Sequence, residues 1–433
     1  MDQIDRRSLL SAGLALSAAA SATGAAAQRI ARPGFLWGTA GAAYQVEGGN
    51  YASDIWALEH LTTPIFAEPS GDADDVYNRV HEDIALSASL GFNAHRFSIE
   101  WSRIEPEQGQ ISLAGIAYYR RVLESCHAHG LTPVVTYIHN SVPRWYAAGG
   151  GLSTPDGVAP FVRYCELVTR HLGDLIGVAA TMNEPNIGAL LSWSPAVTRL
   201  APMIALAQTA ARRQTGYPNW SSPMLDLLNP RQPITVEAHS RAYDAIKAIS
   251  GDRFPVGVTL AINDDKPGLP TSGVEAKRAQ VLAPWLAAPG DIVCVQNYTE
   301  TRVGPTADMP PEPGQEVTQM GYAFAPQALE AVIRTVSQLT RRPIYVTENG
   351  IATEDDTRRV AFIKTAVAGV QRCVADGLDV RGYLHWSLLD NWEWTSGYRP
   401  KFGLVSVDRT TFRRTPKPSA LLLGAIARAG GIA

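Results

Sequence analysis

The chain has 433 residues, of which 45% are hydrophobic and 18% are charged. This composition is typical of a globular protein with enough apolar side chains to bury a sizeable core. The formal net charge is −3 and no basic run occurs, so nucleic acid is not expected as a partner.

The first 27 residues have a composition of their own. Arg6 and Arg7 precede an apolar run rich in Ala, Ser and Gly, which ends in an A-x-A pattern at 25–27. Paired arginines before such a run are typical of twin-arginine export signals, and the run is too short for a membrane-spanning helix. We expect residues 1–27 to be an export signal, the mature chain to begin near Gln28, and the protein to reach the periplasm. A retained leader would instead anchor the protein in the membrane.

From residue 28 onward, short apolar runs alternate with longer amphipathic ones. The strand candidates are 35–45, 93–99, 132–138, 177–182, 254–260, 291–298, 343–347 and 380–386. The helix candidates are 81–90, 116–129, 159–172, 236–250, 276–286, 327–339, 357–375 and 418–429. Eight such units predict an α/β fold in which 28–433 form a single (β/α)8 TIM barrel. A doubly wound sheet has the same alternation and is the alternative. Two Pro-rich segments, 194–233 and 303–326, are expected to be long loops on the functional face.

The cysteines and two neighbouring histidines show no metal-binding pattern. Cys126, Cys165, Cys294 and Cys373 are widely spaced, with no C-x-x-C, so neither a zinc site nor a redox motif is indicated. We expect buried free thiols, with disulfides as the alternative in an oxidising compartment. His127 and His129 have no acidic or cysteine partner at ligand spacing and are interpreted as the end of a helix.

Polar and aromatic residues collect where the predicted strands end. In a barrel these ends converge on one rim. The residues concerned are Gln45, Arg96, His139, Asn140, Asn183, Glu184, Tyr298, Glu348, Trp386, Glu393 and Trp394.

Two glutamates among them, in T-M-N-E-P and V-T-E-N-G, suggest a carboxylate pair. Such a pair can cleave the bond between a sugar and its substituent, because one carboxylic acid protonates the leaving oxygen while the other, ionised, attacks the anomeric carbon. These roles need a raised pKa at one carboxyl and hydrogen-bond donors at the other. Each motif alone is weak, since a glutamate before Pro or Asn-Gly is often only a turn. Their joint occurrence at strand ends is more specific.

The motifs together resemble those of the family 1 glycoside hydrolases, the β-glucosidase-type retaining enzymes. The matching blocks are F-L-W-G-T-A-G-A-A-Y-Q-V-E-G-G at 35–49, N-A-H-R-F-S-I-E-W-S-R-I at 93–104, T-M-N-E-P-N at 181–186, Y-V-T-E-N-G at 345–350, W-S-L-L-D-N-W-E-W at 386–394 and F-G-L-V-S-V-D at 402–408. Their order extends over nearly the whole mature chain.

This resemblance implies a role for each matching residue. Glu184 would be the general acid/base, Glu348 the nucleophile, and Asn183 a ligand of the sugar 2-hydroxyl. Arg96 and Tyr298 would orient Glu348 and keep it ionised. The sugar itself would contact Gln45, His139, Trp386, Glu393 and Trp394. Asn140, next to His139, is a further candidate for substrate binding although it does not match the family. The reaction needs no cofactor or metal, and the partner would be a small soluble glycoside.

Two departures from the family pattern affect the sugar pocket. The family usually has an aromatic residue, most often Trp, where this chain has Asn140, and it usually has Asn where this chain has Gln296. Glu393 matches the members that act on unphosphorylated sugars, because its charge would repel a phosphate. The sequence therefore predicts a retaining β-glycosidase for terminal β-linked glucose, galactose or fucose.

Two alternatives to a hydrolase follow from the same motifs. A transglycosidase would use the same glycosyl-enzyme intermediate as a hydrolase. A non-catalytic sugar-binding protein is disfavoured because both glutamates are present. The leaving group and the oligomeric state are not determined by these motifs.

Overall fold

Eight parallel strands close into a barrel in the computed structural model, which describes residues 34–62, 65–226 and 232–432. The order around the barrel is β1-β11-β10-β7-β5-β4-β3-β2. The strands are β1 (Leu36–Ala40), β2 (Ala94–Ser98), β3 (Thr132–Ile138), β4 (Val178–Asn183), β5 (Val256–Ala261), β7 (Val293–Asn297), β10 (Ile344–Asn349) and β11 (Val380–Trp386). The closed ring confirms the (β/α)8 prediction over the doubly wound alternative.

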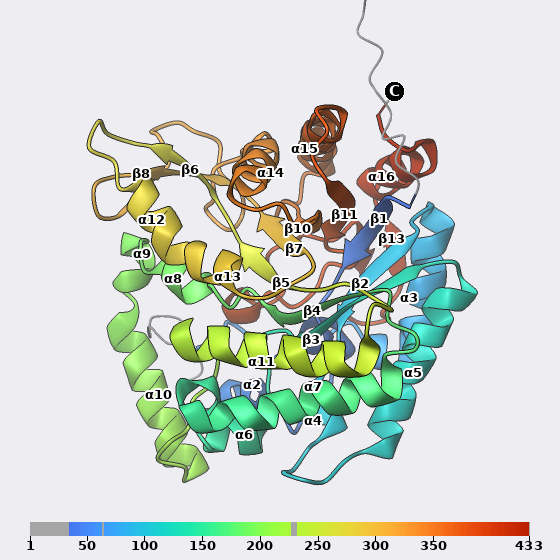
Figure 1. Ribbon diagram of the computed structural model, residues 1–433, viewed down its shortest axis with the longest axis vertical. Coiled ribbons are helices and arrows are strands. Elements are labelled where there is room, and N and C mark those ends of the chain that lie inside the picture. The colour runs from blue at the N-terminus through green and yellow to red at the C-terminus, as the bar shows by residue number, and fades with distance from the viewer. Residues whose placement is uncertain (1–33, 63–64, 227–231, 433) are drawn as a thin grey trace, which may run out of the picture.

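Helices surround the barrel and connect its strands (Figure 1). The main connecting helices are α3 (Val76–Leu90), α5 (Leu113–Ala128), α7 (Val158–Leu172), α11 (Gln232–Ser250), α12 (Val274–Val281), α13 (Ala283–Ala287), α14 (Ala328–Leu339) and α15 (Asp356–Ala375). A last helix, α16 (Pro418–Ala429), packs against α15 and α3 and so completes the ring after β11.

Shorter elements decorate the loops. The short helices are α1 (Ala43–Glu47), α2 (Asp54–Glu59), α4 (Trp101–Ile104), α6 (Arg144–Ala148), α8 (Ile187–Leu191) and α9 (Pro195–Thr198), with single 3-10 turns η1 (Gly151–Ser153), η2 (Pro155–Gly157) and η3 (Trp394–Ser396). A longer helix, α10 (Ala201–Thr215), follows α9. Two small sheets lie outside the barrel: β6 (Asp264–Pro267), β8 (Glu300–Val303) and β9 (Asp308–Met309) form one, and β12 (Val405–Val407) with β13 (Arg414–Pro416) forms the other.

Apolar side chains fill both sides of the strand ring. An inner cluster inside the barrel includes Leu36, Val134, Val178 and Leu384, each less than 10% exposed. A larger cluster packs the outer faces of the strands against the surrounding helices. Because both faces are buried, the strands are continuous apolar runs, as expected for a parallel sheet. The site residues at the strand ends are therefore held by rigid elements.

The predicted strand 35–45 is wrong in its second half. The observed strand β1 ends at Ala40, and 43–47 form the short helix α1. Small residues at 41–43 let the chain turn there, and the Ser98 hydroxyl accepts a hydrogen bond from the Ala43 amide at 2.8 Å. Gln45 therefore enters the site from a helix and not from a strand.

The expectation of a long loop over 194–233 is also wrong. This segment contains α9 and the four-turn helix α10. Ser194 caps α9 and is followed by Pro195 at the first helical position, while α10 has Pro202 in its first turn and four further alanines after Ala201. Pro at a helix start is favourable, so these prolines begin helices instead of breaking them. By contrast, Pro284 divides the predicted helix 276–286 into α12 and α13.

The remaining predictions concern the cysteines and the leader. All four cysteines are buried and free, as expected. His127 lies in the last turn of α5, and His129 caps its end. Residues 1–27, with the proposed signal, lie outside the described residues, so the domain boundary at 28 stays a prediction.

Candidate active site

Four strands on different sides of the barrel bring the central polar residues together. Arg96 comes from β2, Asn183 from β4 and Glu348 from β10, and each is less than 7% exposed. Gln296 comes from β7 and is also buried. Glu184 follows β4 directly and is half-buried. These residues are far apart in the chain and meet only because the barrel closes.

Glu348 is surrounded by hydrogen-bond donors. Its Oε1 accepts from an Arg96 guanidinium nitrogen and from Gln296 Nε2 at 2.5 Å, and its Oε2 accepts from the Tyr298 hydroxyl at 2.5 Å. Burial raises the pKa of Glu348, while the Arg96 charge and the Tyr298 hydroxyl oppose that rise. Donors to both oxygens favour the ionised form of this carboxylate.

Glu184 has a different environment. No hydrogen bond reaches its carboxyl from any described residue, and burial together with the Glu348 charge raises its pKa to about 8. Its backbone has a φ of 44° and its amide donates to the Thr259 carbonyl oxygen at 3.0 Å. A half-buried carboxyl that receives no protein donor and lies beside a carboxylate keeps its proton near neutral pH. The two glutamates are therefore chemically unlike.

Asn183 is oriented by three donors to its side-chain oxygen. Arg96 Nη2 donates to Oδ1 at 2.7 Å, Gln296 Nε2 at 2.8 Å and the Thr259 hydroxyl at 3.1 Å. Because Oδ1 is engaged in this way, the amide Nδ2 is the end left for a substrate. A donor at this position suits the oxygen of a sugar hydroxyl.

Gln45 and Glu393 form a second polar group in the pocket. Gln45 Nε2 donates to the Trp392 carbonyl at 2.9 Å, to Asn391 Oδ1 at 3.1 Å and to Glu393 Oε2 at 3.2 Å. Gln45 Oε1 is buried and has no partner among the described residues. Burial and the Glu348 charge raise the pKa of Glu393 to about 8. An unpartnered amide oxygen beside a carboxyl is suited to bind adjacent hydroxyls.

Aromatic rings line the pocket beside these groups. The His139 ring is stacked near Trp386, with ring centroids 5.7 Å apart, and near Trp394, at 6.2 Å. Burial and the Arg96 charge hold the pKa of His139 well below its usual value, so the ring is neutral. Flat apolar faces of this kind suit the face of a sugar ring.

Backbone strain is concentrated at the site. Six non-glycine residues in the described part of the chain have positive φ, and three of them are Asn140, Glu184 and Trp394. Such conformations cost free energy and persist where the surrounding structure imposes them, often at functional sites. Gly350 is needed for a related reason, because a Cβ there would lie 2.0 Å from the Trp386 carbonyl oxygen.

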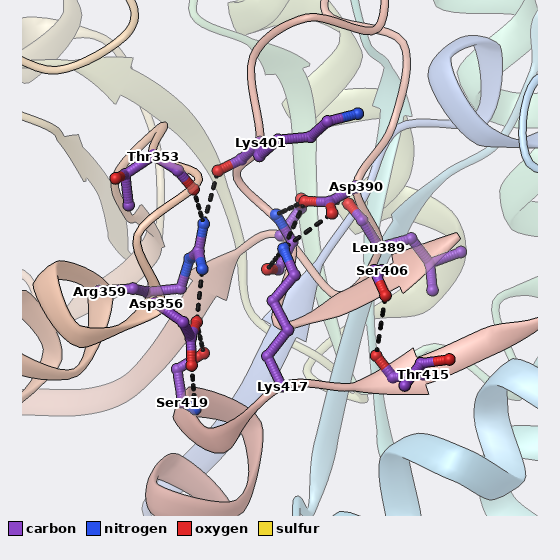
Figure 2. Close-up of polar contacts among 12 residues, drawn as sticks. Thr353, Asp356, Arg359, Leu389, Asp390, Lys401, Ser406, Thr415, Lys417 and Ser419 are labelled. Atoms are coloured by element: carbon purple, nitrogen blue, oxygen red, sulfur yellow. Dashed lines mark hydrogen bonds and ion pairs between the residues drawn. The ribbon is translucent and has the colours of Figure 1, made fainter. Parts of the chain in front are cut away.

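The loop that presents Glu393 and Trp394 is fixed from outside the barrel (Figure 2). Lys417, at the start of α16, donates to both carboxylate oxygens of Asp390 at 2.7 and 2.8 Å and to the Gly403 carbonyl at 2.8 Å. Alongside it, Arg359 donates to the Lys401 carbonyl at 2.7 Å. The beginning and the end of the loop after β11 are thereby tied to the last helix.

Gln296 and Tyr322 are residues whose part in the site the sequence did not predict. Gln296 was noticeable only as a departure from the family pattern, yet it bonds both Glu348 and Asn183. Tyr322 lies in the irregular segment after β9. It is 41% exposed, yet loss of solvent around its hydroxyl, together with the charges of Glu393 and Glu184, raises its pKa to about 12. Nothing in the sequence around Tyr322 indicates that it lies near Glu184 and Glu393.

The described residues contain neither a metal site nor a membrane-spanning helix. No group of three or more His, Cys, Asp or Glu side chains is arranged to hold a metal ion among them. None of the helices that the structure describes has the length and apolar character needed to cross a membrane.

Comparison with known proteins agrees with this geometry. The model of the family described as glycosyl hydrolase family 1 matches residues 28–281 and 291–432. A bifunctional β-D-glucosidase/β-D-fucosidase of Bifidobacterium breve is 30% identical, over 89% of this chain and 95% of its own. The solved structure of a β-glucosidase named 1317 has a TM-score of 0.90 at 59% identity and covers 92% of this chain and 99% of its own. The solved structure of a β-glycosidase named BGL167 has a TM-score of 0.85 at 47% identity and covers 93% of this chain and 98% of its own. The chain therefore belongs to glycosyl hydrolase family 1 and is a retaining β-glycosidase.

Proposed function

We propose that Glu348 is the nucleophile and Glu184 the general acid/base of a double displacement. The observation that carries this assignment is the contrast between the carboxyls: Glu348 accepts from three donors, and burial raises the pKa of Glu184 to about 8. Glu348 attacks the anomeric carbon while Glu184 gives its proton to the leaving oxygen. Glu184 then removes a proton from water, which releases the sugar from Glu348.

The other pocket residues take supporting roles in this proposal. Asn183 donates to the 2-hydroxyl, Arg96 and Tyr298 keep Glu348 ionised, and Gln45, His139 and Glu393 bind the remaining hydroxyls. Trp386 and Trp394 contact the sugar ring, and Asn140 borders the pocket. Water is the acceptor in this proposal, and comparing the sugar transferred to an added alcohol with the sugar hydrolysed tests it.

Terminal β-linked glucose is the proposed sugar, with fucose second. Two of the relatives named above are β-glucosidases, and the third is named only as a β-glycosidase. The Bifidobacterium protein is named a β-D-fucosidase as well. Glu393 supports an unphosphorylated sugar. A panel of 4-nitrophenyl β-glycosides of glucose, fucose and galactose ranks the three by kcat/KM.

Replacing the nucleophile tests the mechanism. Glu348→Gln keeps the shape of the side chain but removes its charge, so turnover of 4-nitrophenyl β-glucoside should fall at least a thousandfold. The exposed glutamate at position 82 provides the control, since Glu82→Gln should retain wild-type turnover. Wild-type turnover by Glu348→Gln would overturn the assignment.

We also propose that the enzyme is exported with 1–27 as a cleaved twin-arginine signal and that 28–433 form the catalytic barrel. Arg6, Arg7 and the A-x-A pattern at 25–27 support this. Replacing both arginines by lysine should leave activity in the cytoplasm. N-terminal sequencing of the exported protein locates the cleavage.

A further inference from the structure

A cavity of about 200 Å³ opens beside the proposed acid Glu184. Its outer end has exposed polar residues: Gln280 Nε2 donates to the Ser192 hydroxyl at 3.3 Å. Its inner end has the buried side chains of Ile138 and Met182. The cavity therefore runs from the surface to the ends of β3 and β4.

The position of the cavity identifies the part of a glycoside that it faces. It is bordered by Glu184, Asn183 and Asn140, and not by Glu348, Gln45, Glu393 or Trp394, which surround the sugar. The general acid must contact the leaving oxygen. A cavity on the Glu184 side of the cleaved bond therefore faces the leaving group and not the sugar.

Asn140 contributes to the opening between the site and this cavity. Its backbone has a φ of 61°, and its side chain has no hydrogen bond to any described residue. The family resemblance gives a bulky aromatic residue at this position. The smaller asparagine leaves space between the loops after β3 and β4.

The walls of the cavity are mainly apolar. Tyr146, Leu152, Ile187 and Met224 line it together with the two buried side chains of its inner end. Two of the polar groups on the wall are engaged with each other, because the Ser221 hydroxyl donates to Asp226 Oδ2. That oxygen also accepts from the Ser153 hydroxyl, outside the wall, at 2.5 Å. A sugar as leaving group would bury several hydroxyls against apolar atoms, at a cost in free energy. An alkyl or aryl leaving group has no hydroxyls to bury and so does not incur this cost.

We propose that this cavity binds the leaving group and selects glycosides with an apolar aglycone, alkyl or aromatic, over oligosaccharides. The inference rests on the proposed function, because it takes Glu184 as the acid. The volume is sufficient, since a dry apolar cavity of about 150 Å³ holds a benzene molecule. Asn140 acts as the specificity-determining residue at the entrance.

A series of alkyl β-glucosides tests this proposal on the whole enzyme. Methyl, butyl and hexyl β-glucosides have the same sugar and leaving groups of similar basicity, so they differ mainly in apolar area. Burial of each methylene predicts a rise in kcat/KM of about threefold to fourfold until the cavity is full. Cellobiose should react at least tenfold less efficiently than hexyl β-glucoside.

Two variants fill the cavity at different depths. Met224→Trp narrows it from the wall, and Ser192→Trp obstructs the exposed mouth without entering the core. Either should lower the hexyl-to-methyl ratio of kcat/KM at least fivefold. Met203→Trp is the matched control, because Met203 is 60% exposed on α10 and does not line the cavity. Ser192→Trp keeps the test valid if Met224→Trp does not fold.

The possible outcomes separate this inference from the proposed function. Absence of turnover on every β-glucoside would contradict the proposed function itself. Equal kcat/KM for methyl and hexyl β-glucosides would overturn only the assignment of the cavity. The assignment of the cavity would also be overturned if Ser192→Trp folded and left the hexyl-to-methyl ratio of kcat/KM unchanged. It would be overturned as well if cellobiose were a better substrate than hexyl β-glucoside.

Discussion

At the residue scale, two chemically identical side chains differ because of their neighbours. Glu348 has a guanidinium, an amide and a phenol within hydrogen-bond distance, whereas no donor reaches the carboxyl of Glu184 from the described residues. When two carboxyls share a buried pocket, one proton is retained by the less well solvated group. The pair is therefore divided into a nucleophile and an acid before substrate binds.

This division predicts the alkaline limb of the pH profile. Glu184 must be protonated to assist departure, and its pKa is raised to about 8, so kcat/KM for an aryl β-glucoside should fall about tenfold per pH unit above pH 8. The apparent pKa that this pH profile gives belongs to Glu184 and Glu348 together, because the two carboxyls titrate as a coupled pair. In Glu184→Ala, assayed with a leaving group that needs no protonation, the limb should be absent. A limb that persists in this variant would contradict the role of Glu184.

A second prediction concerns the residue that departs from the family pattern. Gln296→Asn shortens the side chain by one methylene and withdraws its amide from both Glu348 and Asn183. Loss of a donor to a carboxylate should reduce kcat/KM about tenfold to a hundredfold and move the acid limb of the profile to higher pH, because the pKa of Glu348 rises. Exposed Gln327→Asn is the control. An unshifted acid limb would show that Gln296 does not hold Glu348 ionised.

At the element scale, strands were predicted better than short helices. The strands 132–138 and 380–386 match β3 and β11 at both ends, because buried parallel strands have uninterrupted apolar sequences. The helix α1 and the helices α9 and α10 were missed. Short helices depend on caps and tertiary contacts more than on periodicity.

The junction between α16 and the loop after β11 makes a prediction at this scale. The Lys417 and Asp390 side chains are 16% and 7% exposed, so Lys417→Met leaves a nearly buried carboxylate without its cation. Loss of one partner of a buried pair should lower the free energy of unfolding by about 3–5 kcal/mol. Thermal denaturation checks this, with exposed Lys364→Met as the control.

Adding Asp390→Asn to Lys417→Met shows whether the unpaired charge is the cause. The double variant should recover part of the lost stability, because the buried group is then neutral. A double variant as unstable as the sum of the two single variants would show that the charges do not interact.

At the scale of the whole molecule, stability depends on pH through buried acids. Asp54, at the start of α2, accepts from the Val142 amide at 2.9 Å and from the Ser222 hydroxyl at 2.5 Å, so it links three separate segments. Burial raises its pKa from 3.8 to about 7. The folded protein then binds more protons than the unfolded chain, and stability decreases as the pH rises from about 4 to about 7.

Asp54→Asn should remove this part of the pH dependence. The raised pKa of Asp54 corresponds to a loss of unfolding free energy on the order of 4 kcal/mol across that pH range. The difference in Tm between pH 5 and pH 8 should therefore be smaller in the variant than in the wild type. Asp252→Asn is the control, since the Asp252 side chain is fully exposed. An unchanged Tm difference would show that Asp54 ionises normally in the folded state.

The sequence by itself determined the alternation of strands and helices and the two glutamates at strand ends, since these follow from local patterns of apolar and polar residues. The tertiary structure decided between a closed barrel and a doubly wound sheet, which have the same alternation. Only the tertiary structure decided which groups surround each glutamate. The Arg96 and Gln296 contacts to Glu348 join residues 252 and 52 positions apart. The raised pKa of Glu184, the orientation of Asn183 and the cavity beside Asn140 depend on burial and distance. Both are defined only when the ring of strands closes.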